Sequence, residues 1–331
     1  MRSAIILAAG KGTRMKSALN KVMHPVSNKP MIGHIVCSLR KAGVDNIVVV
    51  VGHGAESVRE YLGDSVRYAV QEPQLGTGHA VMQAQCLADL DGDTLILNGD
   101  GPCIQSETID RVFAANADSE MTVLTAVLPD GERYGRIIRN AEGYVERIVE
   151  AKDCTPQELA VTEINTGIFC FKNRLLFAHL KEIRNDNAQQ EYYLTDLVAI
   201  FNQCGLRVNA LVADDPQETM GVNDRIDLAK AQKWMTRHEC ERHMRNGVTI
   251  IDPETVYIDV GVKIGADTVI YPNVIIQGGT VIGERVTILS NSFLRNAVIA
   301  DEVCIDSSKI VESSVGARTT IGPATRMSAA A

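Results

Sequence analysis

The sequence predicts an α/β domain with a mostly parallel sheet, followed by a parallel β-helix. Two patterns carry this prediction: short runs of Val, Ile and Leu alternate with helix-like stretches up to about residue 222, and aliphatic residues recur at every sixth position after residue 248. The length of 331 residues suits about two domains. A hydrophobic fraction of 45% and a charged fraction of 22% are close to the globular average, which excludes a disordered or fibrous protein.

The first part of the chain alternates predicted strands and helices. Four apolar runs have the length and composition of buried strands: 3–9, 46–51, 94–98 and 121–127. Helical patterns lie between them, for example over 29–42 and 77–90. This alternation favours a sheet with covering helices, and ligands on such sheets bind at the carboxyl ends of the strands.

A long helix is predicted to connect the two parts. No Gly or Pro occurs between Gly221 and Gly247, the stretch is rich in good helix formers, and Gly247 is a plausible end. We therefore expect an α/β domain over 1–227, a linker helix over 228–247 and a repeat domain over 248–331.

The repeat domain is predicted from a spacing of six between aliphatic residues. Seven positions follow this spacing strictly: Ile258, Ile264, Ile270, Ile276, Ile282, Ile288 and Leu294. The phase then slips by one residue to Ile299, Ile305 and Val311, and again to Val315 and Ile321. A period of six does not fit an α-helix, whereas hexapeptide repeats are typical of a parallel β-helix. A β-sandwich with accidental spacing is the alternative.

Charge and composition also limit the partners. With 33 basic and 41 acidic residues the formal charge is −8, which argues against a surface that coats nucleic acid. No apolar run approaches the roughly 20 residues needed to cross a bilayer, and no signal peptide is recognised. Eight cysteines without a C-x-x-C motif are typical of a reduced protein. We expect a cytoplasmic protein without nucleic-acid or membrane partners, which can bind an anion only through a local cationic pocket or a metal.

The strongest local motif is LAAGKGTRM over residues 7–15, directly after the first predicted strand. Gly10 and Gly12 permit a tight turn that brings backbone N–H groups close to a ligand, and a helix starting there would favour an anion. Arg14 and Lys21 add positive charge suited to phosphates. The motif is neither G-x-G-x-x-G nor a P-loop. An ordinary strand-to-helix turn remains the alternative.

Further polar residues follow predicted strands or lie in Gly-rich loops. Asp100 in Asn98-Gly99-Asp100 is expected at the carboxyl edge of the sheet, where a carboxylate can hold Mg²⁺ or simply form a turn. The Gln71 amide offers the donor and acceptor that a uracil edge requires, and a Gly-rich loop follows it.

These segments together resemble the N-acetylglucosamine-1-phosphate uridyltransferase family, over essentially the whole chain and in the same order. The matching segments are LAAGKGTRM (7–15), Lys21 in KVMH, QEPQLGTGHA (71–80), NGD (98–100), YGRI (134–137), VEAKD (149–153), EINTG (163–167), NAQQEYYLTD (187–196), GVNDR (221–225) and the hexapeptide repeats. Asn98 departs from the family pattern, which often has an aromatic residue or Cys there, and Gly101-Pro102-Cys103 is also unusual.

The resemblance implies a Rossmann-like nucleotide-diphospho-sugar transferase domain followed by a left-handed β-helix. It implies Mg²⁺-dependent uridylyl transfer from UTP to N-acetylglucosamine 1-phosphate, which yields UDP-N-acetylglucosamine and pyrophosphate for peptidoglycan and lipopolysaccharide precursors. It also implies a homotrimer. The family's acetyltransferase half needs further coils, so we expect this chain, ending at Ala331, to be truncated and to lack acetyltransferase activity.

The resemblance also assigns roles to individual residues. The resemblance implies that Leu7, Ala8, Ala9 and Gly10 contact the nucleotide. It implies that Arg14 and Lys21 are catalytic and contact the phosphates. It implies that Gln71, Gly76 and Thr77 recognise the uracil and hold the nucleoside. The Mg²⁺ ligands are Asp100 and Asn223. The residues expected to bind the N-acetylglucosamine moiety are Gly135, Glu150 and Asn165. Asn98 and Gly99 complete the expected set of substrate-binding residues.

Two alternative functions stay open. Another sugar nucleotidyltransferase would use glucose 1-phosphate with dTTP or ATP, but EINTG and GVNDR argue against it. A catalytically silent regulatory or assembly subunit could share the architecture, but the simultaneous presence of Arg14, Lys21, Asp100 and Asn223 disfavours it.

The linker helix contains a pair of histidines that superficially suggests a zinc site. His238 and His243 are five residues apart, which places them about 140° apart around a helix. We therefore expect a solvated helix face there and no zinc site.

Overall fold

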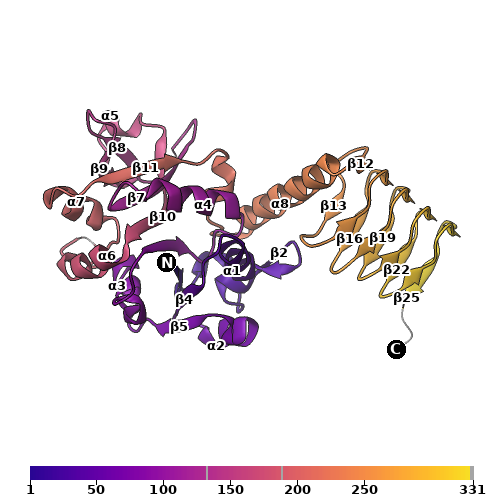
Figure 1. The fold of residues 1–331 in the computed structure, drawn as a ribbon, viewed down its shortest axis with the longest axis horizontal. Coiled ribbons are helices and arrows are strands. Elements are labelled where there is room, and N and C mark those ends of the chain that lie inside the picture. Colours follow the sequence, from indigo (N-terminus) through magenta and orange to yellow (C-terminus); the bar gives the residue numbers. More distant parts are fainter. Residues whose placement is uncertain (132, 188, 329–331) are drawn as a thin grey trace. The chain divides into compact units, whose positions relative to one another are not determined.

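The computed structural model describes residues 1–131, 133–187 and 189–328, and these form two compact units. The α/β unit comprises Met1–His24 and Pro30–Asp227, and the β-helix unit comprises Pro25–Lys29 and Leu228–Ala331. Figure 1 shows a sheet flanked by helices in the first unit and stacked coils of short strands in the second.

The α/β unit is built on one sheet with the strand order β11-β7-β10-β6-β1-β4-β5, extended by the pair β8-β9. The strands are β1 Arg2–Ala8, β4 Asn46–Val51, β5 Arg67–Val70, β6 Asp93–Asn98, β7 Met121–Val127, β8 Arg136–Arg139, β9 Val145–Val149, β10 Glu163–Lys172 and β11 Val208–Val212. β1 pairs in parallel with both β4 and β6, whereas β10 runs antiparallel to β6 and β7. The mostly parallel sheet predicted from the sequence is confirmed.

Helices cover both faces of this sheet. The α-helices are α1 Met31–Lys41, α2 Ala55–Leu62, α3 Thr77–Met82, α4 Ser106–Ala115, α5 Pro156–Leu159, α6 Asn173–His179 and α7 Asp196–Gln203. Short 3₁₀ turns are η1 Thr13–Met15, η2 Lys21–Met23, η3 Gly63–Ser65, η4 Gln85–Leu87, η5 Ala151–Asp153, η6 Leu180–Glu182 and η7 Pro216–Thr219. Alternate residues of β1 enter two cores, with Ile6 packed in the α1 and α4 core and Ile5 in the α3 and α7 core. A strand buried on both faces explains why its sequence is continuously apolar.

The helix predicted over 77–90 is shorter in the structure. α3 ends at Met82, and a separate 3₁₀ turn follows. The buried Asn173 side chain donates to the carbonyls of Leu87 and Leu90, both at 2.7 Å. The Leu87 carbonyl also accepts from the Leu90 N–H at 3.0 Å, so this segment combines short local turns with a tertiary contact that the local sequence pattern does not reveal.

The predicted long helix is present as α8, Arg225–Arg245. The expectation of a solvated face at its histidines is wrong for His243, which is only 2% exposed. Burial, reinforced by the neighbouring Arg242, lowers the pKa of His243 to about 4. His238 instead stacks on Trp234 with ring centroids 5.1 Å apart. The two histidines therefore have separate packing roles.

After α8 the chain forms three parallel sheets, as the hexapeptide spacing predicts. Their strand orders are β12-β15-β18-β21-β24, β13-β16-β19-β22-β25 and β14-β17-β20-β23. The strands are β12 Thr249–Ile250, β13 Tyr257–Ile258, β14 Lys263–Ile264, β15 Val269–Ile270, β16 Ile275–Gln277, β17 Val281–Ile282, β18 Thr287–Ile288, β19 Phe293–Arg295, β20 Val298–Ile299, β21 Cys304–Ile305, β22 Lys309–Val311, β23 Ser314–Val315, β24 Thr320–Ile321 and β25 Arg326–Ser328. A small separate pair, β2 Pro25–Val26 and β3 Lys29–Pro30, precedes α1. The three stacked sheets form the left-handed parallel β-helix, and the β-sandwich alternative is excluded.

The predicted aliphatic positions form the continuous core of the β-helix. Ile258 pairs with Ile276 and Ile276 with Leu294, so the same inward position repeats from coil to coil. One predicted position is wrong by a residue, because Leu294 pairs with Ile310 and not with Val311. The coil between them is shortened, which turns Ile310 fully into the core and leaves Val311 9% exposed.

Two further observations concern the whole described chain. None of its helices combines the length and the apolar composition needed to span a membrane. All eight cysteines are free thiols.

Ile276→Ala is expected to destabilise the β-helix unit by about 2–5 kcal/mol, because it removes a fully buried side chain from the stacked core. Chemical denaturation followed by circular dichroism measures this change. Lys263→Ala, at an exposed strand position, is the control and should change stability by less than about 0.5 kcal/mol. Equal stability of the two variants would contradict the stacked-core assignment.

Candidate functional site

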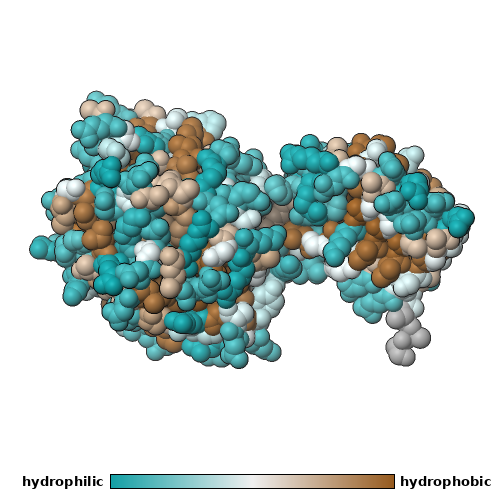
Figure 2. Space-filling view, viewed as in Figure 1, coloured by the Kyte–Doolittle hydropathy of each residue, from teal (hydrophilic) through white to brown (hydrophobic). Residues whose placement is uncertain are grey.

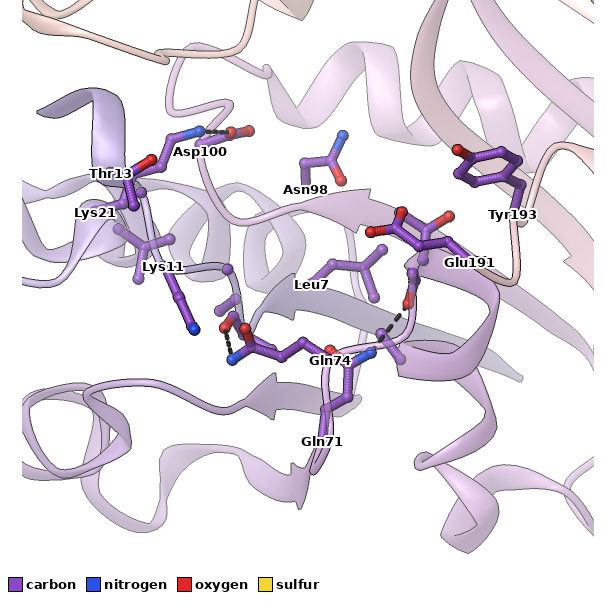
Figure 3. A pocket seen from close by; sticks show the side chains of 18 residues that line it. Leu7, Lys11, Thr13, Lys21, Gln71, Gln74, Asn98, Asp100, Glu191 and Tyr193 are labelled. Atoms are coloured by element: carbon purple, nitrogen blue, oxygen red, sulfur yellow. Dashed lines mark hydrogen bonds and ion pairs between the residues drawn. The ribbon is translucent and has the colours of Figure 1, made fainter. Parts of the chain in front are cut away.

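Two adjoining cavities lie in the α/β unit, at the carboxyl ends of β1 and β6. The first has a volume of about 650 Å³ and the second about 510 Å³. Both are lined by Leu7, Thr77, Asn98 and Tyr193, so they form one continuous cleft. Figure 3 shows Lys21 and Asp100 on one side of the first cavity and Tyr193 on the opposite side, with Asn98 between them. This position agrees with the sheet edge predicted for ligand binding.

The Gly-rich loop after β1 forms one wall of the first cavity, but no α-helix follows it. The expected anion-binding helix start is wrong, because only the single 3₁₀ turn Thr13–Met15 is present before Lys16 takes a left-handed conformation. Gly12 has φ 60°, and a Cβ there would lie 2.6 Å from the Cβ of Lys21. The loop is therefore shaped by close approach to Lys21, and positive side chains supply the charge that a helix dipole was expected to supply.

Four charged or polar side chains meet beside this loop. The Lys21 ammonium forms an ion pair with Asp100, and it also donates to the Asn223 Oδ1 at 3.1 Å. Arg14 donates to the same oxygen at 2.8 Å. Lys21 and Asp100 are mostly buried, with side chains 13% and 20% exposed. Segments far apart in the sequence thus place two cations and two oxygen donors together.

The backbone explains why Asn223 reaches this cluster. The Val222 N–H donates to the Asp100 carbonyl at 2.9 Å, which ties the GVNDR segment to the loop after β6. A Cβ at Gly221 would lie 3.3 Å from the Asp100 carboxylate, so the lack of a side chain permits this approach. The Asp100 carboxylate and the Asn223 amide oxygen converge on one ammonium group. Such hard oxygen donors suit a divalent cation of the Mg²⁺ type.

The opposite wall of the first cavity is formed by amide side chains. Gln71 is 4% exposed, and its Nε2 donates to the Gly76 carbonyl at 3.0 Å, which fixes the amide orientation. Gln74 donates to the Ala9 carbonyl at 2.7 Å and so ties this wall to the Gly-rich loop. The Thr77 hydroxyl, at the start of α3, accepts a bond from the Leu194 N–H at 3.0 Å.

The second cavity contains Glu150 and Asn165. The Asn165 N–H donates to the Gly135 carbonyl at 2.8 Å, and an irregularity in β10 follows Asn165. Burial raises the pKa of Glu150, and nearby Lys152 opposes this shift. Because Glu150 and Lys152 both line the cavity, it presents both hydrogen-bond acceptors and donors to a polar ligand.

The structure brings most of the predicted site residues to the cleft. Those lining the first cavity are Leu7, Ala8, Ala9, Gly10, Lys21, Gln71, Gly76, Thr77, Asn98 and Asp100, and those lining the second include Asn98, Glu150 and Asn165. Four predicted residues do not line either cavity: Arg14, Gly99, Gly135 and Asn223. Arg14 and Asn223 are hydrogen-bonded to each other in the charged cluster beside the first cavity. Gly99 has a backbone role, since its N–H donates to the Leu7 carbonyl at 2.8 Å.

Several cleft residues were not predicted individually. They include Lys11, Thr13, Gln74, Arg133, Lys152, Gly167, Phe169, Gln189, Glu191, Tyr193 and Thr195. Gln189, Glu191, Tyr193 and Thr195 belong to the NAQQEYYLTD segment, whose run of polar and aromatic residues is the signal that could have identified them.

Gly12→Ala is expected to destabilise the α/β unit by about 1–3 kcal/mol, because alanine is strained at positive φ and its Cβ would displace Lys21. Thermal and chemical denaturation measure the loss. Gly10→Ala is a matched control in the same loop, since a Cβ there meets nothing within 4 Å. If both variants retained parental stability, the close approach at Gly12 would be refuted.

Comparison with known proteins identifies the same two parts. Residues 3–218 match the nucleotidyl transferase family, and residues 261–296 match the bacterial transferase hexapeptide family with its six repeats. A solved structure, a putative glucose-1-phosphate thymidylyltransferase from Bacillus anthracis in complex with a sucrose, shares the fold with a TM-score of 0.57 at 22% identity, over 70% of this chain and 94% of that chain.

Longer relatives share much more of the sequence. The bifunctional protein GlmU of Latilactobacillus sakei is 50% identical over 97% of this chain and 70% of the relative. That of Listeria monocytogenes serotype 4a is 48% identical over 97% of this chain and 71% of the relative. The resemblance noted in the sequence is confirmed. The chain belongs to the GlmU family and is a nucleotidyltransferase of the UDP-N-acetylglucosamine pyrophosphorylase type.

Proposed function

We propose that this chain transfers a uridylyl group from UTP to N-acetylglucosamine 1-phosphate, with Mg²⁺, and releases UDP-N-acetylglucosamine and pyrophosphate. The observation that carries the proposal is the charged cluster of Arg14, Lys21, Asp100 and Asn223 at one side of a two-cavity cleft. Two anionic substrates must meet in this reaction, and an acidic chain requires a local concentration of cations for that purpose.

The two cavities suit the two substrates. UTP would occupy the first cavity, with its phosphates toward Arg14 and Lys21 and its uracil toward Gln71 and Gly76. The N-acetylglucosamine moiety would occupy the second cavity beside Glu150, where the polar lining offers partners for sugar hydroxyls. The shared wall between the cavities then lies where the sugar phosphate and the nucleotide phosphates meet.

The chemistry requires positioning and charge neutralisation more than proton transfer. An oxygen of the sugar phosphate forms a bond to the α-phosphorus of UTP, and the bond to the departing pyrophosphate breaks. The nucleophile is already an anion, so no general base is needed. Arg14 and Lys21 would hold the phosphates in line and neutralise the growing charge of the leaving group.

Asp100 and Asn223 would hold the Mg²⁺ ion. Their oxygens both contact the Lys21 ammonium, so a cation is already favoured between them. When bound, Mg²⁺ supplies Lewis-acid stabilisation of the phosphate oxygens. The free cysteines suit a reducing compartment, and we place this reaction in the cytoplasm.

A pyrophosphate-release assay over four nucleoside triphosphates and several sugar phosphates tests the proposal. We expect release with UTP and N-acetylglucosamine 1-phosphate to exceed that with every other pair. Preference for dTTP or ATP with glucose 1-phosphate would instead support a different sugar nucleotidyltransferase. Complete inactivity with all pairs would support a silent regulatory subunit.

Asp100→Ala is expected to lower kcat at least about 100-fold with the fold retained, because it removes a charged oxygen donor from the phosphate end of the cleft. Steady-state kinetics at saturating Mg²⁺ measure the loss, and circular dichroism checks the fold. Asp91→Ala, an exposed aspartate paired with Arg174, is the control and should leave kcat unchanged. A kcat within a few-fold of the parent for Asp100→Ala would refute the assignment.

We also propose that the chain assembles as a homotrimer through the β-helix unit. Hydrophobic residues reach the surface of this unit (Figure 2). Val281 and Val298 are 39% and 51% exposed and pair in register on neighbouring coils. Burying such faces in a closed cyclic assembly would stabilise a short solenoid. Light scattering at micromolar concentration should give about three times the 36.0 kDa of one chain, and a monomer mass would contradict the proposal.

A further inference from the structure

Three metal-binding side chains gather on the α/β unit outside the cleft. His179 ends α6, Glu182 ends η6, and Cys204 directly follows α7. Their donor atoms all lie within 4.8 Å of one another, and His179 Nδ1 is 2.9 Å from Glu182 Oε1. None of the three residues lines either cavity of the cleft, and the proposed uridylyl transfer uses none of them.

The backbone that carries these side chains is anchored in the core. Leu180 and Ile183, adjacent to His179 and Glu182, are 2% and 4% exposed. The His179 ring packs edge-on against Phe201, with ring centroids 5.4 Å apart, and Phe201 is fully buried. The imidazole is therefore held in place before any ligand arrives, which lowers the entropic cost of binding.

The Cys204 thiol is held near the imidazole by the end of α7. The Cys204 N–H donates to the carbonyls of Ile200 and Phe201, both at 3.1 Å. The same Phe201 that packs against His179 thus also fixes the backbone of Cys204. Of the eight cysteines, Cys204 and Cys86 are the exposed ones.

The donor set indicates which ion would bind. An imidazole nitrogen, a carboxylate oxygen and a thiolate sulfur are together typical of zinc, whereas Mg²⁺ prefers oxygen donors alone. Donors on one Zn²⁺ ion lie about 3.5 Å apart, so a pair at the 4.8 Å limit would have to approach by about 1 Å. The Glu182 side chain is 52% exposed and can make this adjustment, and water can fill the fourth position.

We propose that His179, Glu182 and Cys204 bind one Zn²⁺ ion. On binding, the Cys204 thiol gives its proton to solvent and the thiolate sulfur bonds to the ion, while His179 binds as neutral imidazole. The ion joins η6 to the end of α7. The stretch of chain between η6 and α7 carries Glu191 and Tyr193, which line the cleft. The ion would therefore link the two elements that precede and follow this cleft-lining stretch in the sequence.

Equilibrium dialysis against Zn²⁺ with excess Mg²⁺ tests the site directly. We expect one Zn²⁺ per chain for the parent, for Asp100→Ala, and for the matched control Cys86→Ser. Cys204→Ser, which replaces one exposed atom, and His179→Ala should each lose it. Retention of zinc by Cys204→Ser, or its loss only in Asp100→Ala, would overturn the proposal without bearing on the uridylyltransferase assignment.

Thiol modification provides a second, site-resolved measurement. Because the free thiolate is the reactive form, Zn²⁺ should slow modification of Cys204 by about tenfold or more and leave Cys86 unchanged. The protection should disappear in His179→Ala, with circular dichroism confirming that this variant is folded. Equal slowing at Cys86 and Cys204, or no slowing at either, would refute a site built from these three residues.

Discussion

The contact of Lys21 with both Asp100 and Asn223 is the interaction on which the cleft depends. Lys21 lies 79 residues from Asp100 and 202 from Asn223 in the sequence, so three separate loops converge on one ammonium group. Gly12 must lack a side chain because the Lys21 side chain packs directly against it. Gly221 likewise lies so close to the Asp100 carboxylate that a side chain there would crowd it. The shape of the Gly-rich loop is thus a consequence of where this buried charge is placed. A mostly buried ammonium requires anionic or polar partners, which makes the cluster a structural constraint as well as a candidate site for phosphates.

The strands and the repeat domain could be predicted because each has a sequence period that burial imposes. β1 and β4 are largely buried on both faces, so both are apolar apart from their first one or two residues, and these apolar runs mark the strands almost to the residue. In the β-helix, one inward residue per face of each coil produces the spacing of six. The error at Val311 occurs where a coil is shortened, since a spacing rule carries no information about which residue a deletion turns inward.

Features that depend on tertiary contacts could not be predicted in this way. The segment after α3 is held by Asn173, whose side chain donates to two carbonyls more than 80 residues earlier in the chain. The burial of His243 depends on packing that helix periodicity alone does not describe. In the cleft, Gln74 and Tyr193 line the same cavity because tertiary hydrogen bonds, such as the one from the Leu194 N–H to the Thr77 hydroxyl, join the start of α3 to the segment after η6. The residues assigned individually from the family resemblance cover more of the first cavity than of the second.

The two cavities of the cleft differ in which charged groups line them, and this bears on how an acidic protein would handle anionic substrates. Lys21 and Arg14 are the cations nearest Asp100 and Asn223, while Glu150 in the second cavity is a carboxyl whose pKa burial raises. A carboxylate beside a phosphate would repel it, so Glu150 is suited to the uncharged hydroxyl and amide groups of a sugar and not to its phosphate. In the proposed reaction this favours a sugar phosphate with its phosphate toward Lys21 and its ring toward Glu150, although Arg133 and Lys152 in the second cavity mean that charge is only one contribution to that direction. With a net charge of −8 the surface disfavours anions on average, so the attraction for anionic substrates must come from the local cations of the cleft.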